Sequence, residues 1–219
     1  MFLSLADLSA VIFDVDGTLI DSNVAHAESW ARALSEHGFA STPARIRPLV
    51  GMGSDKLLPM VGLEEASAQA RAVVQRKKEL FAERLRWLQP TPGARALVGS
   101  LRDHQKGIVV ATSAGDDEMD ALLQQAGVAD LIPKRTSSDD VDRSKPDPDI
   151  VVAAWRRTGA SRDRTVMIGD TPYDVEAARR AGILAVALRC GGHWSDADLK
   201  SAIHIVDDPA ALLAYWQRG

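Results

Sequence analysis

The sequence contains a single cysteine, Cys190, no long apolar run and little net charge. One cysteine cannot form an internal disulfide, so we expect a reducing compartment, the cytoplasm. No segment approaches the roughly 20 apolar residues of a membrane span, and the first ten residues lack the basic start of a secretory signal. The net charge of -4 gives no sign of the basic surface typical of nucleic-acid binding. These absences predict a cytoplasmic globular protein without a nucleic-acid or membrane partner, and a monomer is the default expectation.

Two regions with different secondary-structure patterns divide the chain of 219 residues. After an apolar strand at 10–14, residues 20–88 show helical patterns only: a helix at 22–38, a glycine-rich turn at 50–54 and a long amphipathic helix at 64–88. Beyond a break at Pro90, Pro92 and Gly93, helices and strands alternate to the end. The predicted strands are 107–112, 130–133, 165–169, 183–188 and 203–206, and the predicted helices are 93–104, 116–126, 147–158, 172–181 and 208–217.

This alternation predicts an α/β fold. Near-continuous apolar strands separated by helices are typical of a parallel sheet that is covered by helices on both faces. We therefore expect a three-layer, Rossmann-like core from residues 1–19 and 90–219, with residues 20–89 inserted as a helical cap domain. A cap beside a strand end excludes water from a site and controls access to it, whereas the alternative is an insertion without a function.

The first strand ends in two carboxylates, Asp14 and Asp16, followed by Gly17. Side chains at i and i+2 leave a strand on the same side, so the two acids lie close together. Like charges at this distance are unfavourable unless a cation or a proton intervenes, and a divalent metal ion is the natural solution. The alternative interpretation is a strand followed by a polar Asp-Gly turn.

Other predicted strand ends and helix starts carry polar groups that suit a phosphate. Thr112 and Ser113 supply hydroxyls, Lys145 supplies a positive charge, and Asp170 and Asp174 can complete a set of oxygen ligands for Mg²⁺. Each group also has a structural explanation. Thr112 can simply close a strand, Lys145 can be solvated, and Asp174 can be a favourable acid in the first turn of a helix. The joint pattern favours a divalent cation beside an anion pocket for a phosphate monoester or anhydride.

The ordered motifs closely resemble those of the haloacid dehalogenase-like superfamily. They are DVDGT at 14–18, a hydroxyl at 112, Lys145 before a proline, and GDTPYD at 169–174. The helical insert resembles the cap of the branch that contains phosphoglycolate phosphatase and β-phosphoglucomutase. This resemblance implies a Mg²⁺-dependent phosphatase of small phosphorylated metabolites that forms an aspartyl phosphate. The alternatives are a sugar-phosphate mutase and a non-catalytic phospho-acceptor module.

The resemblance also implies roles for the matching residues. Asp14 would be the nucleophile, and Asp16 would be the general acid and then the general base. Thr112 and Lys145 would hold the phosphoryl oxygens. Asp170 would bind Mg²⁺ together with Asp14 and the main-chain carbonyl of Asp16, supported by Asp174, which would contact the metal directly or through water.

Substrate specificity is expected in the cap. Residues 47–56 align in order with the specificity loop of the branch, and Arg47 and Lys56 are candidate contacts for an anion. His26, on the first cap helix, is a further candidate substrate contact, although a histidine with a purely structural role fits equally well. Ser113 is expected beside Thr112 in the substrate site.

Overall fold

The computed structural model describes residues 4–218, which form a six-stranded parallel sheet in the order β3-β2-β1-β4-β5-β6. Its strands are β1 (Ala10–Phe13), β2 (Gly107–Ala111), β3 (Lys134–Thr136), β4 (Thr165–Gly169), β5 (Leu184–Leu188) and β6 (His204–Val206). Because β1 pairs with both β2 and β4, the carboxyl ends of these three strands lie next to one another. The expected α/β fold is confirmed.

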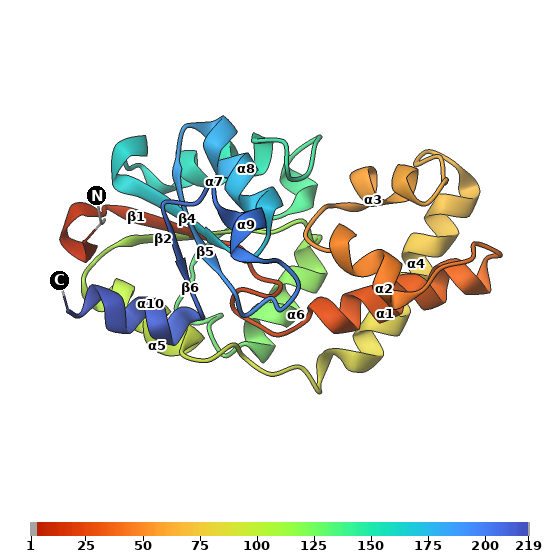
Figure 1. Ribbon diagram of the computed structural model, residues 1–219, viewed down its shortest axis with the longest axis horizontal. Coiled ribbons are helices and arrows are strands. Elements are labelled where there is room, and N and C mark those ends of the chain that lie inside the picture. The colour runs from red at the N-terminus through yellow and green to blue at the C-terminus, as the bar shows by residue number, and fades with distance from the viewer. Residues whose placement is uncertain (1–3, 219) are drawn as a thin grey trace.

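Helices cover both faces of the sheet, as the near-continuous apolar strands predict (Figure 1). Alternate residues of β1 point to opposite faces: Val11 and Phe13 belong to one buried cluster, and Ile12 belongs to another. The first cluster includes residues of α5 (Ala94–Asp103), α6 (Asp116–Gln125) and α10 (Pro209–Trp216). The second includes residues of α7 (Asp149–Thr158), α8 (Pro172–Ala181) and α9 (Asp196–Leu199). Both faces of the sheet are therefore withdrawn from water.

The segment between β1 and α5 is helical and has an apolar cluster of its own. Its helices are α1 (Asn23–Glu36), α2 (Pro43–Ile46), α3 (Ser54–Met60) and α4 (Ala68–Leu85), and they lie beyond the carboxyl end of β1 (Figure 1). The two chain crossings run side by side. The backbone N–H of Asp21 donates to the Gln89 carbonyl at 2.9 Å, and Thr91 donates to the Leu19 carbonyl at 3.1 Å. The chain thus leaves the sheet and returns to it at one place.

Several predicted elements need correction. The short strand predicted near 130–133 is present but lies further along the chain, as β3 (Lys134–Thr136). The apolar Ile132 that suggested this strand is buried in the core cluster, and Leu131 donates its N–H back to Val128 in a turn. The predicted helix 64–88 is shorter, since α4 begins after Ser67, whose hydroxyl accepts the N–H of Ala70. The short helices α2, α3 and α9 were not predicted, because helices of four to seven residues carry too little periodicity to be recognised. Within residues 4–218, no helix combines the length and hydropathy needed to cross a membrane.

Candidate active site

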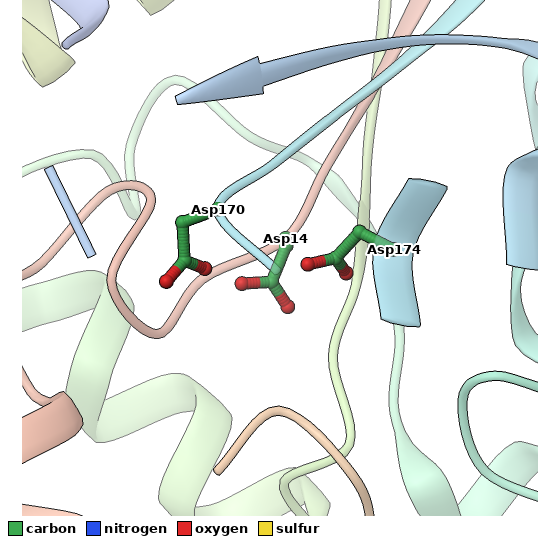
Figure 2. A group of neighbouring side chains, drawn as sticks. All are labelled: Asp14, Asp170 and Asp174. Atoms are coloured by element: carbon green, nitrogen blue, oxygen red, sulfur yellow. The ribbon is translucent and has the colours of Figure 1, made fainter. Parts of the chain in front are cut away.

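Three buried acids meet at the carboxyl edge of the sheet. Asp14 follows β1, Asp170 follows β4, and Asp174 lies in the first turn of α8. Each side chain offers an oxygen, and these oxygens all lie within 4.8 Å of one another. Figure 2 shows the side chain of Asp14 between those of Asp170 and Asp174. A set of closely spaced carboxylate oxygens is the donor set that a hard divalent cation such as Mg²⁺ requires.

Local structure holds each of these carboxylates in place. The N–H and the hydroxyl of Thr171 donate to Asp174 Oδ2 at 3.1 and 2.7 Å, in a capping box at the start of α8. The hydroxyl of Thr18 lies 3.3 Å from both Asp14 Oδ2 and Asp170 Oδ1. Asn23 Nδ2 donates to Asp170 Oδ2 at 2.8 Å. Thr18 lies within the DVDGT motif and could have been found there, whereas no sequence signal singled out Asn23.

Lys145 is completely buried beneath the acids. Its Nζ lies 2.5 Å from Asp14 Oδ1 and 2.7 Å from Asp174 Oδ1, and it donates to the Ala111 carbonyl at 3.3 Å. The alternative interpretation of a solvated lysine is therefore wrong. Burial alone would lower the pKa of Lys145, but the two carboxylates outweigh burial and raise it, so the ammonium keeps its charge.

Burial also shifts the pKa of the acids. It raises the pKa of Asp14 to about 7 against the opposing charge of Lys145, with the charges of Asp174 and Asp16 acting in the same direction as burial. Burial, followed by the charges of Asp14 and Asp174, raises the pKa of Asp170 well above its ordinary value. One lysine is thus too little positive charge for three buried carboxylates. A divalent cation would relieve this imbalance, so the residues present fit a metal ion.

Asp16 has surroundings of its own, outside the three-acid cluster. Ser22 donates its hydroxyl to Asp16 Oδ1 at 2.5 Å, and His26 Nε2 lies 2.8 Å from the same oxygen. Burial acts to raise the pKa of Asp16, but the charge of His26 and the hydrogen bonds from His26 and Ser22 outweigh it and lower that pKa to about 2. The His26 ring stacks on Phe81 of α4, with 3.9 Å between the ring centroids. The structure thus places His26 against an acid, a contact that the sequence did not indicate, and Ser22 was not predicted as a site residue.

A cavity of about 210 Å³ lies between this edge of the sheet and the helical segment. Asp14 and Asp16 line it from the sheet side, and Ser113 lines it from the loop after β2. The lining from the helical segment includes His26, Trp30, residues 50–54, Leu57, Val74, Lys77 and Lys78. A small ligand in this cavity would meet the two acids at one end and the helical segment at the other.

Thr112 and Ser113 differ in position. Thr112 is fully buried, its hydroxyl accepts the N–H of Ala114 at 3.1 Å, and it is not among the lining residues. Ser113 lines the cavity and donates its hydroxyl to the Gly51 carbonyl at 3.1 Å. The structure therefore brings Ser113 to the cavity surface and leaves Thr112 behind it.

Arg47 and Lys56 lie outside the cavity lining. Arg47 Nη2 donates to the Gly191 carbonyl at 2.6 Å, and burial lowers the pKa of its guanidinium. Lys56 Nζ lies 2.8 Å from Asp147 Oδ2. Both side chains thus join the helical segment to the part of the chain that forms the sheet. Their contact with an anionic group of the substrate stays a prediction.

Comparison with known proteins agrees with this geometry. The family model of the haloacid dehalogenase-like hydrolases matches residues 11–188. A phosphoglycolate phosphatase of Rhodospirillum rubrum is 30% identical over 213 residues, covering 93% of this chain and 88% of that protein. An N-acetylmuramic acid 6-phosphate phosphatase of Pseudomonas aeruginosa is 28% identical over 219 residues, covering 94% of this chain and 93% of that protein. The crystal structure of a hydrolase from Pseudomonas syringae superposes with a TM-score of 0.89 at 29% identity, covering 96% of this chain and 98% of that one. The chain therefore belongs to the haloacid dehalogenase-like hydrolase family.

Proposed function

We propose that this protein is a Mg²⁺-dependent phosphatase that hydrolyses small phosphorylated metabolites through an aspartyl phosphate on Asp14. The observation that carries the proposal is the cluster of buried Asp14, Asp170 and Asp174, in which Lys145 pairs with Asp14 and Asp174 and Asp14 lines a small cavity. Phosphoryl transfer needs positioning and charge neutralisation more than it needs covalent chemistry from the protein, and this arrangement supplies both. The phosphatase relatives support the same reaction.

The proposed reaction has two steps, which replace one difficult step by two easier ones. Asp14 attacks the phosphorus, the bond to the leaving oxygen breaks, and Asp16 protonates that oxygen. Water then attacks the phosphorus of the aspartyl phosphate, loses its proton to Asp16, and releases phosphate and free Asp14. The pKa of Asp16, about 2, favours the carboxylate that accepts the proton of water in the second step. In the first step the proton for the leaving oxygen would pass through Asp16 from His26, whose Nε2 lies 2.8 Å from Asp16 Oδ1.

We assign the metal to Asp14 and Asp170 together with the main-chain carbonyl of Asp16, with Asp174 in support. When bound, Mg²⁺ would offset the repulsion between the Asp14 carboxylate and the negative phosphate. Lys145 would restrain Asp14 and neutralise a phosphoryl oxygen, and the loop at Thr112 and Ser113 would hold the remaining oxygens.

We further propose that residues 20–89 act as a cap domain on a core of residues 1–19 and 90–219. The adjacent crossings at 20 and 90, where Ile20 and Pro90 form an isolated antiparallel bridge, give the cap a pair of hinges. For the compartment we propose the cytoplasm, because Cys190 has no second cysteine to pair with.

A panel of phosphate monoesters tests the reaction. We expect phosphate release with Mg²⁺, none after addition of EDTA, and a loss of at least about 10³-fold in Asp14→Asn. The matched control is Asp163→Asn, the same change at an exposed position, which we expect to behave as the unaltered protein. Unchanged turnover in Asp14→Asn would exclude the mechanism.

The same assay separates the two alternatives. A mutase would return the phosphoryl group to the substrate and would require a bisphosphate. A phospho-acceptor module would accumulate phosphoprotein or bind beryllofluoride without measurable hydrolysis.

A further inference from the structure

Two oppositely charged side chains in the cavity wall take no part in the proposed reaction. They are Lys77 of α4 and Glu118 of α6. Lys77 is only 6% exposed, and its Nζ lies 3.0 Å from each carboxylate oxygen of Glu118. The ammonium also lies 4.7 Å from the centroid of the Phe81 ring, in a cation–π contact. The pair thus joins the helical segment to the sheet domain at the cavity.

The positive charges in the described lining are matched by negative ones. His26 lies against Asp16, and Lys77 is held by Glu118. At the exposed rim, Lys78 and Asp139 add one charge of each sign. At the buried part of the wall, a second anionic group on a ligand would have to displace Glu118 from Lys77 or remain unpaired beside that carboxylate. Either event is costly, because it leaves a buried charge without its partner. Lys78 offers little in exchange, because an ion pair with an exposed lysine contributes at most about 1 kcal/mol.

A hydroxyl group fits the same wall without displacing anything. The ammonium of Lys77 has three N–H donors, of which Glu118 takes two, and the Glu118 oxygens retain free lone pairs. A hydroxyl both donates and accepts, so it can bind to the pair on both sides. Ser54 and Ser113 add further uncharged polar groups to the lining.

We infer that the leaving group of the substrate is an uncharged, polyhydroxylated carbon skeleton, and that Glu118 selects against substrates with a second anionic group. The preferred substrate class is thus a phosphorylated polyol or sugar rather than a phosphorylated hydroxy acid. This inference rests on the proposed phosphatase activity and deepens it by assigning specificity to the Lys77–Glu118 pair.

Two substrates of equal length test the inference, because glycerol 3-phosphate and 3-phosphoglycerate differ only in a hydroxymethyl group against a carboxylate. We expect kcat/KM to favour glycerol 3-phosphate by about tenfold or more, the factor that corresponds to one hydrogen bond to a charged group. Glu118→Gln frees the charge of Lys77 and should move this ratio toward 3-phosphoglycerate by about tenfold. Lys77→Gln leaves Glu118 unpaired and should move the ratio in the opposite direction.

The matched control is Glu79→Gln, the same change on the exposed face of α4, which should leave the ratio unaltered. Equal losses for both substrates in Glu118→Gln and Lys77→Gln would show that the pair only holds α4 against α6, and would overturn the inference. So would a preference of the unaltered protein for 3-phosphoglycerate.

A binding measurement keeps the inference separate from the proposed reaction. In the Asp14→Asn variant, glycerol 3-phosphate should raise Tm more than 3-phosphoglycerate does, even if no turnover occurs. Adding Glu118→Gln should move this preference toward 3-phosphoglycerate, and adding Lys77→Gln should move it in the opposite direction. Absence of hydrolysis with every monoester would contradict the proposed function alone, whereas stronger stabilisation by 3-phosphoglycerate would contradict the inference alone.

Discussion

Replacing Lys145 by Met removes a cation that contacts two buried carboxylates. In the folded protein, Asp14 Oδ1 and Asp174 Oδ1 would each lose an ammonium, which lies at 2.5 and 2.7 Å respectively. Removing one partner of a buried ion pair costs about 3–5 kcal/mol of the free energy of unfolding. For a protein of this size, that corresponds to a fall in Tm of about 6–20 °C.

The loss of stability in Lys145→Met should depend on pH, and the pKa of Asp14 decides in which direction it changes. The folded-state pKa of Asp14, about 7, is raised, so the folded state holds this proton more tightly than the unfolded state does. Stability from this group is therefore greatest at low pH and falls as pH rises through the folded pKa. Without Lys145 that pKa rises further. The substitution should cost most above the new pKa, and its cost should shrink by up to about 1.4 kcal/mol for each pH unit between the new pKa and about 7. Below about pH 7 both folded proteins hold the proton on Asp14, so the cost should stay constant there.

Urea unfolding followed by circular dichroism, in EDTA at pH 6 and pH 9, measures both effects. The control is Lys200→Met at an exposed position, which should change stability by no more than about 0.5 kcal/mol. A cost of less than about 1 kcal/mol at pH 9, or a cost that grows as pH falls, would refute the reasoning.

Three further results are expected. Gly191→Ala should cost about 1–3 kcal/mol and weaken Mg²⁺ binding, because the new Cβ would overlap the carboxylate of Asp170. The control is Gly99→Ala in α5, where a Cβ meets nothing within 4 Å, and this change should stabilise the protein by up to about 1 kcal/mol. Similar losses of stability in the two variants, measured by urea unfolding, would contradict the predicted overlap at Gly191. EDTA should lower Tm, and Asp170→Asn should abolish the rise in Tm on adding Mg²⁺; an undiminished rise would remove Asp170 from the metal site. Mg²⁺ affinity by calorimetry should increase from pH 6 to 8 with proton release below pH 7, because burial raises the pKa of Asp14 to about 7 and the cation displaces its proton. An affinity that does not change with pH would count against this assignment.

The sheet and its acidic edge were predictable from local pattern. Apolar strands ending in polar groups identified Asp14 and Asp170 as neighbours, because parallel strands deliver their carboxyl ends to the same edge. The β1–β2 and β1–β4 pairings place them there. The strand expected near 130–133 was placed too early in the chain, because a buried apolar residue such as Ile132 looks the same in the sequence whether it lies in a turn or in a strand.

The sequence did not show which groups the charged side chains contact in the folded protein. Arg47 and Lys56 were expected at the ligand because residues 47–56 resemble the specificity loop of the branch. The folded chain adds that they contact the Gly191 carbonyl and Asp147. Lys77 carried no signal, since a lysine in a charged amphipathic helix is normally solvated.

The sequence by itself determined the parallel sheet, the helical insertion and the presence of acids at the strand ends, because hydrophobic periodicity and residue order are local properties. Only the tertiary structure decided that Lys145 is buried between two acids, that His26 lies against Asp16, and that Glu118 holds Lys77 at the cavity. Each of these contacts joins residues from different elements, and their charges interact strongly only after folding has excluded water from between them.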